Sequence, residues 1–551
     1  MVKEFKDLVV YQAYPKSWQD TTGNGKGDLR GVTQRLPYLA DLGIDLLWLN
    51  PFYKSPQKDN GYDISDYKSI DPDYGTWQDL DELVQKAGDL GIGLMFDMVL
   101  NHVSTDHDWF QKAALGDPYY QDFFYIRPAK EDGSLPTNWE SKFGGPAWAP
   151  FPGSDDYYLC LYDKSQADLN WHNPNVRQAL YDVVNFWIDK GVKGFRFDVL
   201  NVIGKDLDLK DAEDGVGKKE YTDTPIVHEW IRELNHHTFG RRDDLVTVGE
   251  MSSTTIEDSI KYSNPDYQEL DMVFSFHHLK VDYKNGDKWT QMDFDFQELK
   301  RVLNDWQVGL TQGGGWNALF WNNHDQPRAN SRFGDPKNYP YETATMLATT
   351  IHLLRGTPYI YQGEEIGMTN PNFDSIDDYQ DVESHNAYKA LLDRGLDPDQ
   401  ALGIIQDKSR DNGRTPMQWT GRDQAGFTTG QPWLNLAPNY KEVNTQVPDP
   451  SQKIFTYYQK LIRLRKDYKV ISQGDYQGVQ LDHDRIFAYL RVYQGQKLLV
   501  LNHFYPGQAD ISLDPDLVDQ SAKVLISNSG DRTLQEDFTM GPYESVAFLI
   551  D

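Results

Sequence analysis

The sequence predicts an α/β fold: a TIM (β/α)8 barrel with a small domain inserted after the third strand and an all-β domain at the C-terminus. Three observations predict it. Eight short apolar runs recur in the first 365 residues, most of them precede a stretch with helical periodicity, and alternating apolar residues appear near the C-terminus. Strands that alternate with helices form parallel sheets, and eight such units are enough to close a barrel.

The eight runs supply the strands of the predicted barrel. In order they read LVVYQAY, DLLWLN, GLMFDMVL, GFRFDVL, LVTVGE, DMVFSF, WNALFWNN and TPYIYQ. Intervening stretches such as VRQALYDVVNFWIDKG have the apolar period of a helix. In this fold the reacting side chains follow the C-terminal ends of the strands, so the polar residues at those ends are the candidates.

Two segments interrupt the alternation of predicted strands and helices, and they set the domain boundaries. Residues 102–172 are rich in Trp, Tyr, Pro and Gly and too long for a simple loop. From residue 475 the runs RIFAYLRVY, QKLLVLNHF and ESVAFLI alternate as strands do. We therefore assign residues 1–101 and 173–474 to the barrel, 102–172 to an inserted subdomain over the active site, and 475–551 to a C-terminal β-sandwich domain.

The amino-acid composition limits the kinds of molecule that the protein can bind. The chain has 84 acidic and 54 basic side chains, a net charge of −30, and a single cysteine, Cys160, which excludes an internal disulfide. Such a field repels nucleic acids and anionic membranes, so an anionic substrate needs a local cluster of positive charge. The start, MVKEFKDLVVYQAY, has no apolar leader, and no apolar run approaches the ~18 residues of a membrane span. We expect a cytoplasmic protein, monomeric by default.

Acidic residues end three of the predicted strands. Arg196 and Asp198 close the fourth, Glu250 the fifth, and His324 and Asp325 the seventh. Two carboxylates at one barrel mouth are the minimum for glycoside hydrolysis, one as nucleophile and one as proton donor. Arg196 should keep Asp198 ionised, which favours Asp198 as the nucleophile and Glu250 as the proton donor. The alternative is that each carboxylate caps the following helix.

The segments DMVLNH, GFRFDV, VGE and NNHDQ, in this order and on these strands, resemble the α-amylase superfamily, glycoside hydrolase family 13. This resemblance covers nearly the whole chain. It implies that Asp198 is the nucleophile, Glu250 the general acid/base and Asp325 a carboxylate that binds sugar hydroxyls. It also implies retention of the α-anomer, which requires carboxyl groups about 5 to 5.5 Å apart.

The resemblance further assigns a pocket for the first sugar. Tyr62 is the stacking aromatic residue, and Asp63 pairs with Arg414 to close the pocket, which implies attack at a chain end. The remaining assigned residues hold the nucleophile, bind hydroxyls or form an aromatic wall: Arg196, His102, His324 and Phe143. Asp97, Asn101, Gln166 and Asp168 are interpreted as structural.

A glycine-rich loop, DTTGNGKGD, is a candidate metal site. It sets oxygen-bearing side chains at Asp20, Thr22, Asn24 and Asp28, and the resemblance adds the backbone carbonyl of Lys26. Oxygen ligands suit a structural Ca²⁺ or Mg²⁺. The alternative is a turn held by Asx hydrogen bonds. No cofactor is expected for catalysis.

The substrate is predicted from Val199 and from a small basic island. In this family a valine after the nucleophile accompanies α-1,6-linked or phosphorylated substrates, and the chain most resembles the members that cleave trehalose 6-phosphate. The alternative is an α-1,6 glucosidase acting on isomaltose-type linkages. Six basic groups are predicted to bind the phosphate on the leaving sugar: Lys205, Lys280, Lys284, Lys288, His277 and His278. Their lysine spacing also suits one solvated helix face, although Asn285-Gly286 favours a turn.

Overall fold

One eight-stranded sheet contains the predicted barrel strands. The computed structural model describes residues 5–518 and 522–550. The sheet order is β13-β12-β11-β5-β2-β1-β15-β14, and the first and eighth barrel strands pair in parallel through Val10 and Tyr359. The predicted fold class is confirmed. The barrel strands, in chain order, are β1 (Val10–Ala13), β2 (Leu46–Leu49), β5 (Gly93–Val99), β11 (Gly194–Asp198), β12 (Val246–Glu250), β13 (Met272–Phe274), β14 (Ala318–Leu319) and β15 (Thr357–Tyr361).

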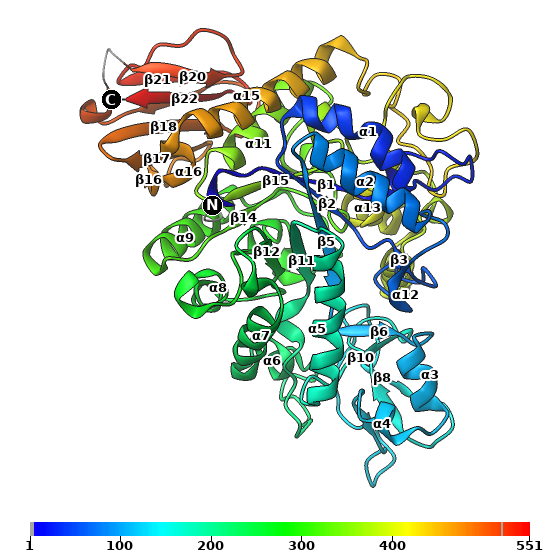
Figure 1. Cartoon of the computed structure of the whole chain (residues 1–551). Helices are drawn as coiled ribbons and strands as arrows, with labels where there is room; N and C mark the ends of the chain where they lie inside the picture. Colours follow the sequence, from blue (N-terminus) through cyan, green and yellow to red (C-terminus); the bar gives the residue numbers. More distant parts are fainter. Residues whose placement is uncertain (1–4, 519–521, 551) are drawn as a thin grey trace. The chain divides into compact units, whose positions relative to one another are not determined.

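Helices follow the strands, as the periodicity predicts (Figure 1). Helix α1 shows the local causes of one boundary: the Asp28 carboxylate accepts a hydrogen bond from the Gly31 N–H, and Gly43 ends the helix at φ 94°. The main helices between barrel strands are α1 (Leu29–Leu42), α2 (Trp77–Asp89), α5 (Pro174–Asp189), α7 (Pro225–His237), α8 (Ile256–Ser263), α9 (Phe296–Gly313) and α11 (Pro340–His352).

The chain divides into two compact units. Unit 1 holds Trp48–Gln85 and Gly93–Ser275. Unit 2 holds residues 5–47, 86–92 and the described residues from 276 onward. Strands β5, β11, β12 and β13 lie in unit 1, and β1, β14 and β15 lie in unit 2. Each unit carries its own share of the predicted site residues.

The insertion after β5 forms small sheets in unit 1. Strand β6 (His102–Ser104) pairs antiparallel with β10 (Gln166–Asp168), which sets His102 opposite Asp168. A three-stranded sheet of β7 (Ile126–Arg127), β9 (Tyr157–Leu159) and β8 (Trp148–Pro150) lies near the helices α3 (Asp108–Ala114) and α4 (Pro118–Gln121) in the cyan part of the chain (Figure 1). The lone cysteine, Cys160, is buried here as a free thiol.

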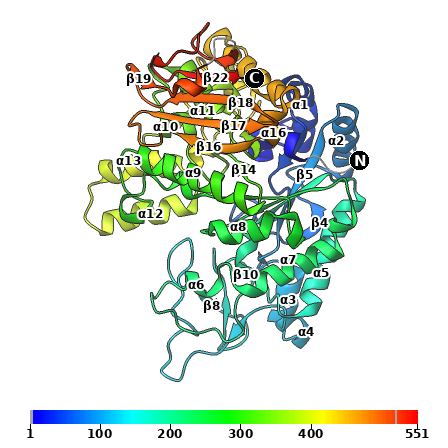
Figure 2. The same ribbon diagram turned by 90° about the vertical axis from the view of Figure 1, so that its left-hand side faces the viewer.

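The C-terminal part of unit 2 is all β after helices α15 (Lys453–Asp467) and α16 (Lys469–Gln473). Figure 2 shows its main antiparallel strands side by side. The five-stranded sheet comprises, in spatial order, β16 (Asp475–Val479), β17 (Ile486–Tyr493), β18 (Gln496–His503), β22 (Ser545–Ile550) and β20 (Lys523–Ser527), and β19 (Ala509–Ser512) pairs with β21 (Asp537–Met540). Alternate residues of β17 and β22 pack into one apolar core. Within the described residues, no helix combines the length and apolar composition needed to cross a bilayer.

Candidate active site

Asp198 and Glu250 end two adjacent parallel strands of unit 1. The register of β11 and β12 pairs Phe197 with Gly249, so the next residue of each strand is a carboxylate at the same sheet edge. Arg196 joins the two: one guanidinium nitrogen donates to Asp198 Oδ1 at 2.6 Å, and the other donates to Glu250 Oε2. The same guanidinium donates to Asp97 at 2.8 Å. The structure thus brings Arg196, Asp198 and Glu250 together, as the strand-end residues predict.

Burial has the largest effect on the pKa of Asp198. Burial raises the pKa of Asp198, and the Glu250 carboxylate raises it further against the opposing effect of the Arg196 guanidinium. The guanidinium thus acts in the direction that the sequence predicts, and burial and Glu250 act against it. Carboxylates that share one guanidinium titrate as a pair, and a pair that holds one proton is the state that a nucleophile and a proton donor need.

The residue after the nucleophile has a strained backbone. Val199 adopts φ 37° and ψ 42°, in the left-handed region. A β-branched side chain is unfavourable there, and such strain persists only where surrounding contacts enforce it. Val199 is buried among apolar residues of the inserted subdomain, including Trp148 and Leu161. The turn directs the chain away from β11 immediately after Asp198.

His102 lies in a buried polar network of unit 1. Its Nε2 is 3.2 Å from the Tyr62 carbonyl oxygen and 3.2 Å from Gln166 Nε2, and its Nδ1 is 3.1 Å from Asn101 Nδ2. Burial lowers the pKa of His102 to about 4. The imidazole is therefore neutral at physiological pH and suited to hydrogen bonding with an uncharged sugar hydroxyl.

Asp59, and not Asp63, is the carboxylate in this network. Gln166 Nε2, which contacts His102, also donates to Asp59 Oδ2 at 3.0 Å. Asp63 has no exposed surface, and its oxygens accept bonds from the Ser55 hydroxyl and from the backbone N–H groups of Lys58 and Asp59. The predicted role of Asp63 in sugar binding is wrong, because local donors occupy its carboxylate.

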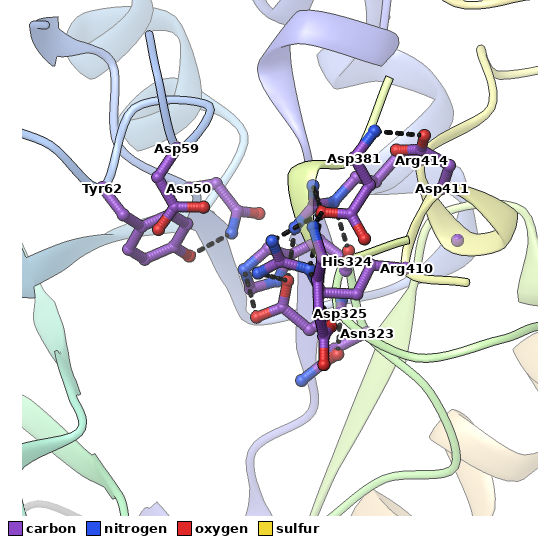
Figure 3. Close-up of polar contacts among 12 residues, drawn as sticks. Asn50, Asp59, Tyr62, Asn323, His324, Asp325, Asp381, Arg410, Asp411 and Arg414 are labelled. Carbon is purple, nitrogen blue, oxygen red and sulfur yellow. Dashed lines mark hydrogen bonds and ion pairs between the residues drawn. The ribbon is translucent and has the colours of Figure 1, made fainter. Parts of the chain in front are cut away.

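Tyr62 is held by polar contacts at its hydroxyl. The hydroxyl accepts from Asn50 Nδ2 at 2.7 Å (Figure 3). It donates to Asp97 Oδ2 at 2.9 Å. Its ring lies 5.9 Å from the Arg196 guanidinium carbon. This anchored ring is consistent with the predicted stacking residue.

Tyr162 is a neighbour of the catalytic pair that no sequence pattern marked. The charges of Asp198 and Glu250 both raise its pKa, after the larger effect of burial. Its ring is 5.2 Å from that of His102 and 5.6 Å from that of Phe143. Phe143, Tyr162 and His102 therefore form one group of rings. The role of Phe143 as a wall of the sugar pocket stays a prediction.

Lys205 is buried and paired, which contradicts its predicted role in phosphate binding. Its ammonium is 2.7 Å from Asp168 Oδ2 and 2.5 Å from Asn101 Oδ1, and its side chain has no exposed surface. Burial lowers the pKa of Lys205, and the Asp168 carboxylate opposes this effect. Lys205 is an internal cation that links β10 to the residue before His102.

In unit 2, Asp325 lies in a cluster of arginines. Its Oδ1 accepts from Arg414 Nη2 at 2.5 Å and lies 3.6 Å from Arg410 Nη1 (Figure 3). Burial alone would raise the pKa of Asp325, but His324, Arg414 and Arg410 hold it well below its usual range. Asp325 is therefore a carboxylate, with about 29% of its side chain exposed to accept hydroxyl hydrogen bonds.

Arg414 and His324 are fixed by other groups of unit 2. Arg414 Nε donates to the His324 carbonyl oxygen at 2.7 Å, and Arg414 Nη1 lies 3.9 Å from Asp381 Oδ1. His324 Nδ1 lies 2.9 Å from Gln12 Nε2. Asp381, which the sequence did not suggest, accepts from Arg410 at 2.6 Å and completes the cluster. No apolar run precedes Asp381 or Arg410, so no strand-end pattern marks them.

The other predicted phosphate ligands lie in unit 2. Besides Lys205, two of them have internal partners: Lys288 pairs with Glu383 at 2.7 Å, and His278 Nε2 lies 2.8 Å from the Phe320 carbonyl oxygen. His277 stacks on Trp306 with a ring distance of 5.3 Å. Lys280 follows the short helix η6 (His277–Leu279), and Lys284 is exposed.

The segment between Lys284 and Lys288 is a turn. Asn285 has φ 56° and Gly286 has φ 81°, both in the left-handed region. The expected Asn-Gly turn is confirmed, and the alternative of one continuous helix face is wrong. Phosphate binding by Lys280 or Lys284 stays a prediction.

Hydrogen bonds fill the loop that was predicted to hold a metal. The Asp20 carboxylate accepts from the N–H groups of Thr22, Gly23 and Gly25, at 2.8 to 2.9 Å, and from the Thr428 hydroxyl. Asp28 accepts from Thr21 and Gly31, and Asn24 Oδ1 accepts from the Lys26 N–H at 2.8 Å. Among the described residues there is no group of three or more His, Cys, Asp or Glu side chains suited to a metal. These bonds are those of the turn held by Asx hydrogen bonds, and a structural cation in the loop stays a prediction.

Sequence comparison finds close relatives along the full length. A trehalose-6-phosphate hydrolase of Bacillus subtilis (strain 168) is 52% identical over 548 residues, which cover 99% of this chain and 98% of that protein. An oligo-1,6-glucosidase of Bacillus cereus is 44% identical and covers 99% of both chains.

Solved structures show the same fold. The crystal structure of Bacillus licheniformis trehalose-6-phosphate hydrolase matches with a TM-score of 0.94 and 52% identity over 99% of each chain. The isomaltulose synthase of Erwinia rhapontici NX5 matches with a TM-score of 0.94 and 38% identity, over 100% of this chain and 99% of that chain.

Family models match both parts of the chain. A model of the α-amylase SusG C-terminal domain matches residues 486–547. A model of the α-amylase catalytic domain matches residues 12–474, which include the catalytic pair and the Asp325 cluster. The chain therefore belongs to the α-amylase family.

Proposed function

We propose that this protein hydrolyses α,α-trehalose 6-phosphate to glucose and glucose 6-phosphate with retention at the anomeric carbon. The observation that carries the proposal is the 52% identity, over 99% of the chain, to a trehalose-6-phosphate hydrolase. The Arg196-bridged pair of Asp198 and Glu250 supplies the chemistry. Because the substrate is a disaccharide, the glucose that is attacked is always terminal, and no Asp63–Arg414 pair is needed to explain this.

The proposed reaction has two steps. First, the Asp198 carboxylate attacks the anomeric carbon while Glu250 gives its proton to the glycosidic oxygen, so glucose 6-phosphate leaves and a glucosyl ester forms. Glu250 then takes a proton from water, the water oxygen attacks the same carbon, and glucose leaves Asp198. Two inversions retain the α-configuration. Asp325 and neutral His102 are proposed to bind hydroxyls of the glucose.

The second candidate is an oligo-1,6-glucosidase. The 44% identity over 99% of both chains to the Bacillus cereus enzyme favours it, as does Val199. It needs no phosphate site, so the two candidates differ in what they require of the leaving sugar.

One panel of substrates tests the choice. Purified protein is assayed with trehalose 6-phosphate, trehalose, isomaltose and p-nitrophenyl α-glucoside. We expect kcat/KM for trehalose 6-phosphate to exceed that for trehalose by at least about 100-fold, since two or more charge-assisted contacts to phosphate each stabilise binding by about 1.5 to 3 kcal/mol. Faster turnover of isomaltose than of trehalose 6-phosphate would transfer the assignment to the second candidate.

A structural Ca²⁺ or Mg²⁺ at residues 20–28 is proposed from the sequence alone. A cation that binds only the folded protein stabilises it by mass action, so millimolar Ca²⁺ should raise the Tm by a few degrees and EGTA should reverse the change. Asp20→Asn should abolish the increase. An identical Tm in Ca²⁺ and in EGTA would leave the hydrogen bonds of Asp20 as the whole support of the loop.

We also propose the cytoplasm as the site of action. The proposed substrate and one product carry a phosphate, and such charged sugars do not cross an apolar bilayer unaided. The buried free thiol of Cys160 is compatible with a reducing compartment.

A further inference from the structure

A cation lies beside the general acid in unit 1. The Lys142 ammonium is 2.9 Å from the Ser252 hydroxyl oxygen, and Ser252 is two residues after Glu250. The ammonium also lies 5.7 Å from the ring centre of Tyr162 and 5.5 Å from that of Tyr221. We refer to Lys142, Tyr162, Tyr221 and Ser252 as the Lys142 cluster. None of them was among the predicted site residues.

The backbone on the Lys142 side of the cluster is held in place. The Lys142 N–H donates to the Leu161 carbonyl oxygen at 2.8 Å, and the Ser141 hydroxyl donates to the Tyr162 carbonyl oxygen at 2.5 Å. The Phe143 N–H in turn donates to the Ser141 hydroxyl at 3.1 Å. These bonds fix the loop before a ligand arrives, which lowers the entropy lost on binding.

The Ser252 side is held by Asn201. The Ser252 N–H donates to Asn201 Oδ1, and Asn201 Nδ2 donates to the Ser252 carbonyl oxygen, both at 2.9 Å. Asn201 itself follows β11 closely, three residues after Asp198. Ser252 is thus positioned by the same strand ends that carry the catalytic pair.

The cluster adjoins the reacting groups. The charges of Asp198 and Glu250 affect the Tyr162 hydroxyl, which is buried and has no hydrogen-bond partner among the described residues. Buried polar groups of this kind are rare in proteins and are often satisfied by a ligand or water. Lys142 and Ser252 are only partly buried.

The position beside Glu250 points to the leaving sugar. A general acid contacts the glycosidic oxygen, which belongs to the leaving group, whereas the nucleophile contacts the sugar that stays on the enzyme. An ammonium and a hydroxyl next to the acid therefore suit an anionic substituent on the leaving sugar.

We propose that Lys142 and Ser252 bind the phosphate of the leaving sugar and so select a phosphomonoester over an unphosphorylated glucoside. This inference rests on the proposed function and assigns its phosphate site. The phosphate accepts hydrogen bonds from the Lys142 ammonium and from the Ser252 hydroxyl. In a chain of net charge −30, such a short-range contact is needed to hold a dianionic group.

The test separates phosphate binding from catalysis. kcat and KM are measured for trehalose 6-phosphate and for p-nitrophenyl α-glucoside in the wild type, Lys142→Met, Lys142→Arg and Ser252→Ala. We expect Lys142→Met to raise the KM for trehalose 6-phosphate by tenfold or more and to change kcat/KM for the aryl glucoside by less than about twofold, because only binding outside the reacting centre is lost. Lys142→Arg should recover part of the loss. Lys164→Met, an exposed lysine of the same subdomain, is the control and should match the wild type on both substrates.

Product inhibition tests the phosphate site without requiring that the protein hydrolyses trehalose 6-phosphate. Glucose 6-phosphate is tested against glucose as an inhibitor of aryl glucoside hydrolysis. A wild-type preference for glucose 6-phosphate that Lys142→Met abolishes supports the site even if trehalose 6-phosphate is not hydrolysed. Lys284→Met is measured in the same way. Equal losses on both substrates, an unchanged KM in Lys142→Met, or a raised KM in Lys284→Met alone would each overturn the assignment to Lys142 and Ser252.

Discussion

Replacing Asp198 by alanine is expected to lower kcat by about 10⁴-fold or more on every α-glucoside, because no other described group at the end of β11 can form the glucosyl ester. The measurement is the initial rate on trehalose 6-phosphate and on the aryl glucoside. Arg196 keeps the carboxylates of Asp97 and Glu250 as partners in the variant, so the fold should survive.

Two controls make this result specific. Asp243→Ala removes an exposed carboxylate of unit 1 and should retain wild-type rates. The circular dichroism spectrum and the Tm of Asp198→Ala should remain those of a folded protein. Activity above about 1% of wild type in a folded Asp198→Ala protein would disprove the nucleophile assignment.

Replacing Glu250 by glutamine is expected to reduce kcat/KM by about 10² to 10⁴-fold on trehalose 6-phosphate, the usual contribution of general acid–base catalysis. The loss in kcat/KM should be much smaller for p-nitrophenyl α-glucoside, because nitrophenolate leaves without protonation. The measurement is the ratio of the loss in kcat/KM on trehalose 6-phosphate to the loss in kcat/KM on the aryl glucoside. Equal losses would place Glu250 in sugar binding and not in proton transfer.

The pH profile provides a second measure of the same role. Burial and like charge raise the pKa of Asp198, so the pair retains one proton to higher pH than an isolated carboxylate would. That proton is required for the first step, so wild-type kcat/KM should fall as pH rises through the last ionisation of the pair. In Glu250→Gln this alkaline fall should disappear, and an unchanged alkaline limb would assign it to another group.

The strand-end carboxylates could be predicted because their positions depend on a simple pattern. An apolar run that stops at Asp198 or Glu250 locates the side chain at a sheet edge, and the parallel register then brings the two edges together. The fold class was predictable for the same reason, since the order of strands and helices along the chain limits the topology.

Residues in turns were harder to predict. In the segment KDNGYD, the carboxylates of Asp59 and Asp63 are four residues apart, and left-handed conformations at Asn60 (φ 49°) and Gly61 (φ 105°) decide where each points. Asp63 bonds back to its own loop, whereas Asp59 contacts Gln166. A family motif read without these dihedral angles selected the wrong aspartate.

Charged residues with buried partners were mistaken for surface groups. Lys205 follows the nucleophile strand and appeared free to bind phosphate, but its partner Asp168 lies 37 positions earlier in the sequence, on β10. Lys142 was overlooked for the opposite reason: Ser252, which reveals its position, is 110 residues away. Long-range pairs of this kind are set by packing and leave no local signal in the sequence.

The buried ammonium of Lys205 makes the geometry around His102 insensitive to the ions in the medium. A positive charge that anchors two strands of a subdomain is elsewhere often an exchangeable ion, whose occupancy follows supply and competes with chelators. Here the charge is part of the polypeptide and is present in every folded molecule. The link from Asp168 to Asn101 and His102 is therefore independent of the ionic composition of the medium.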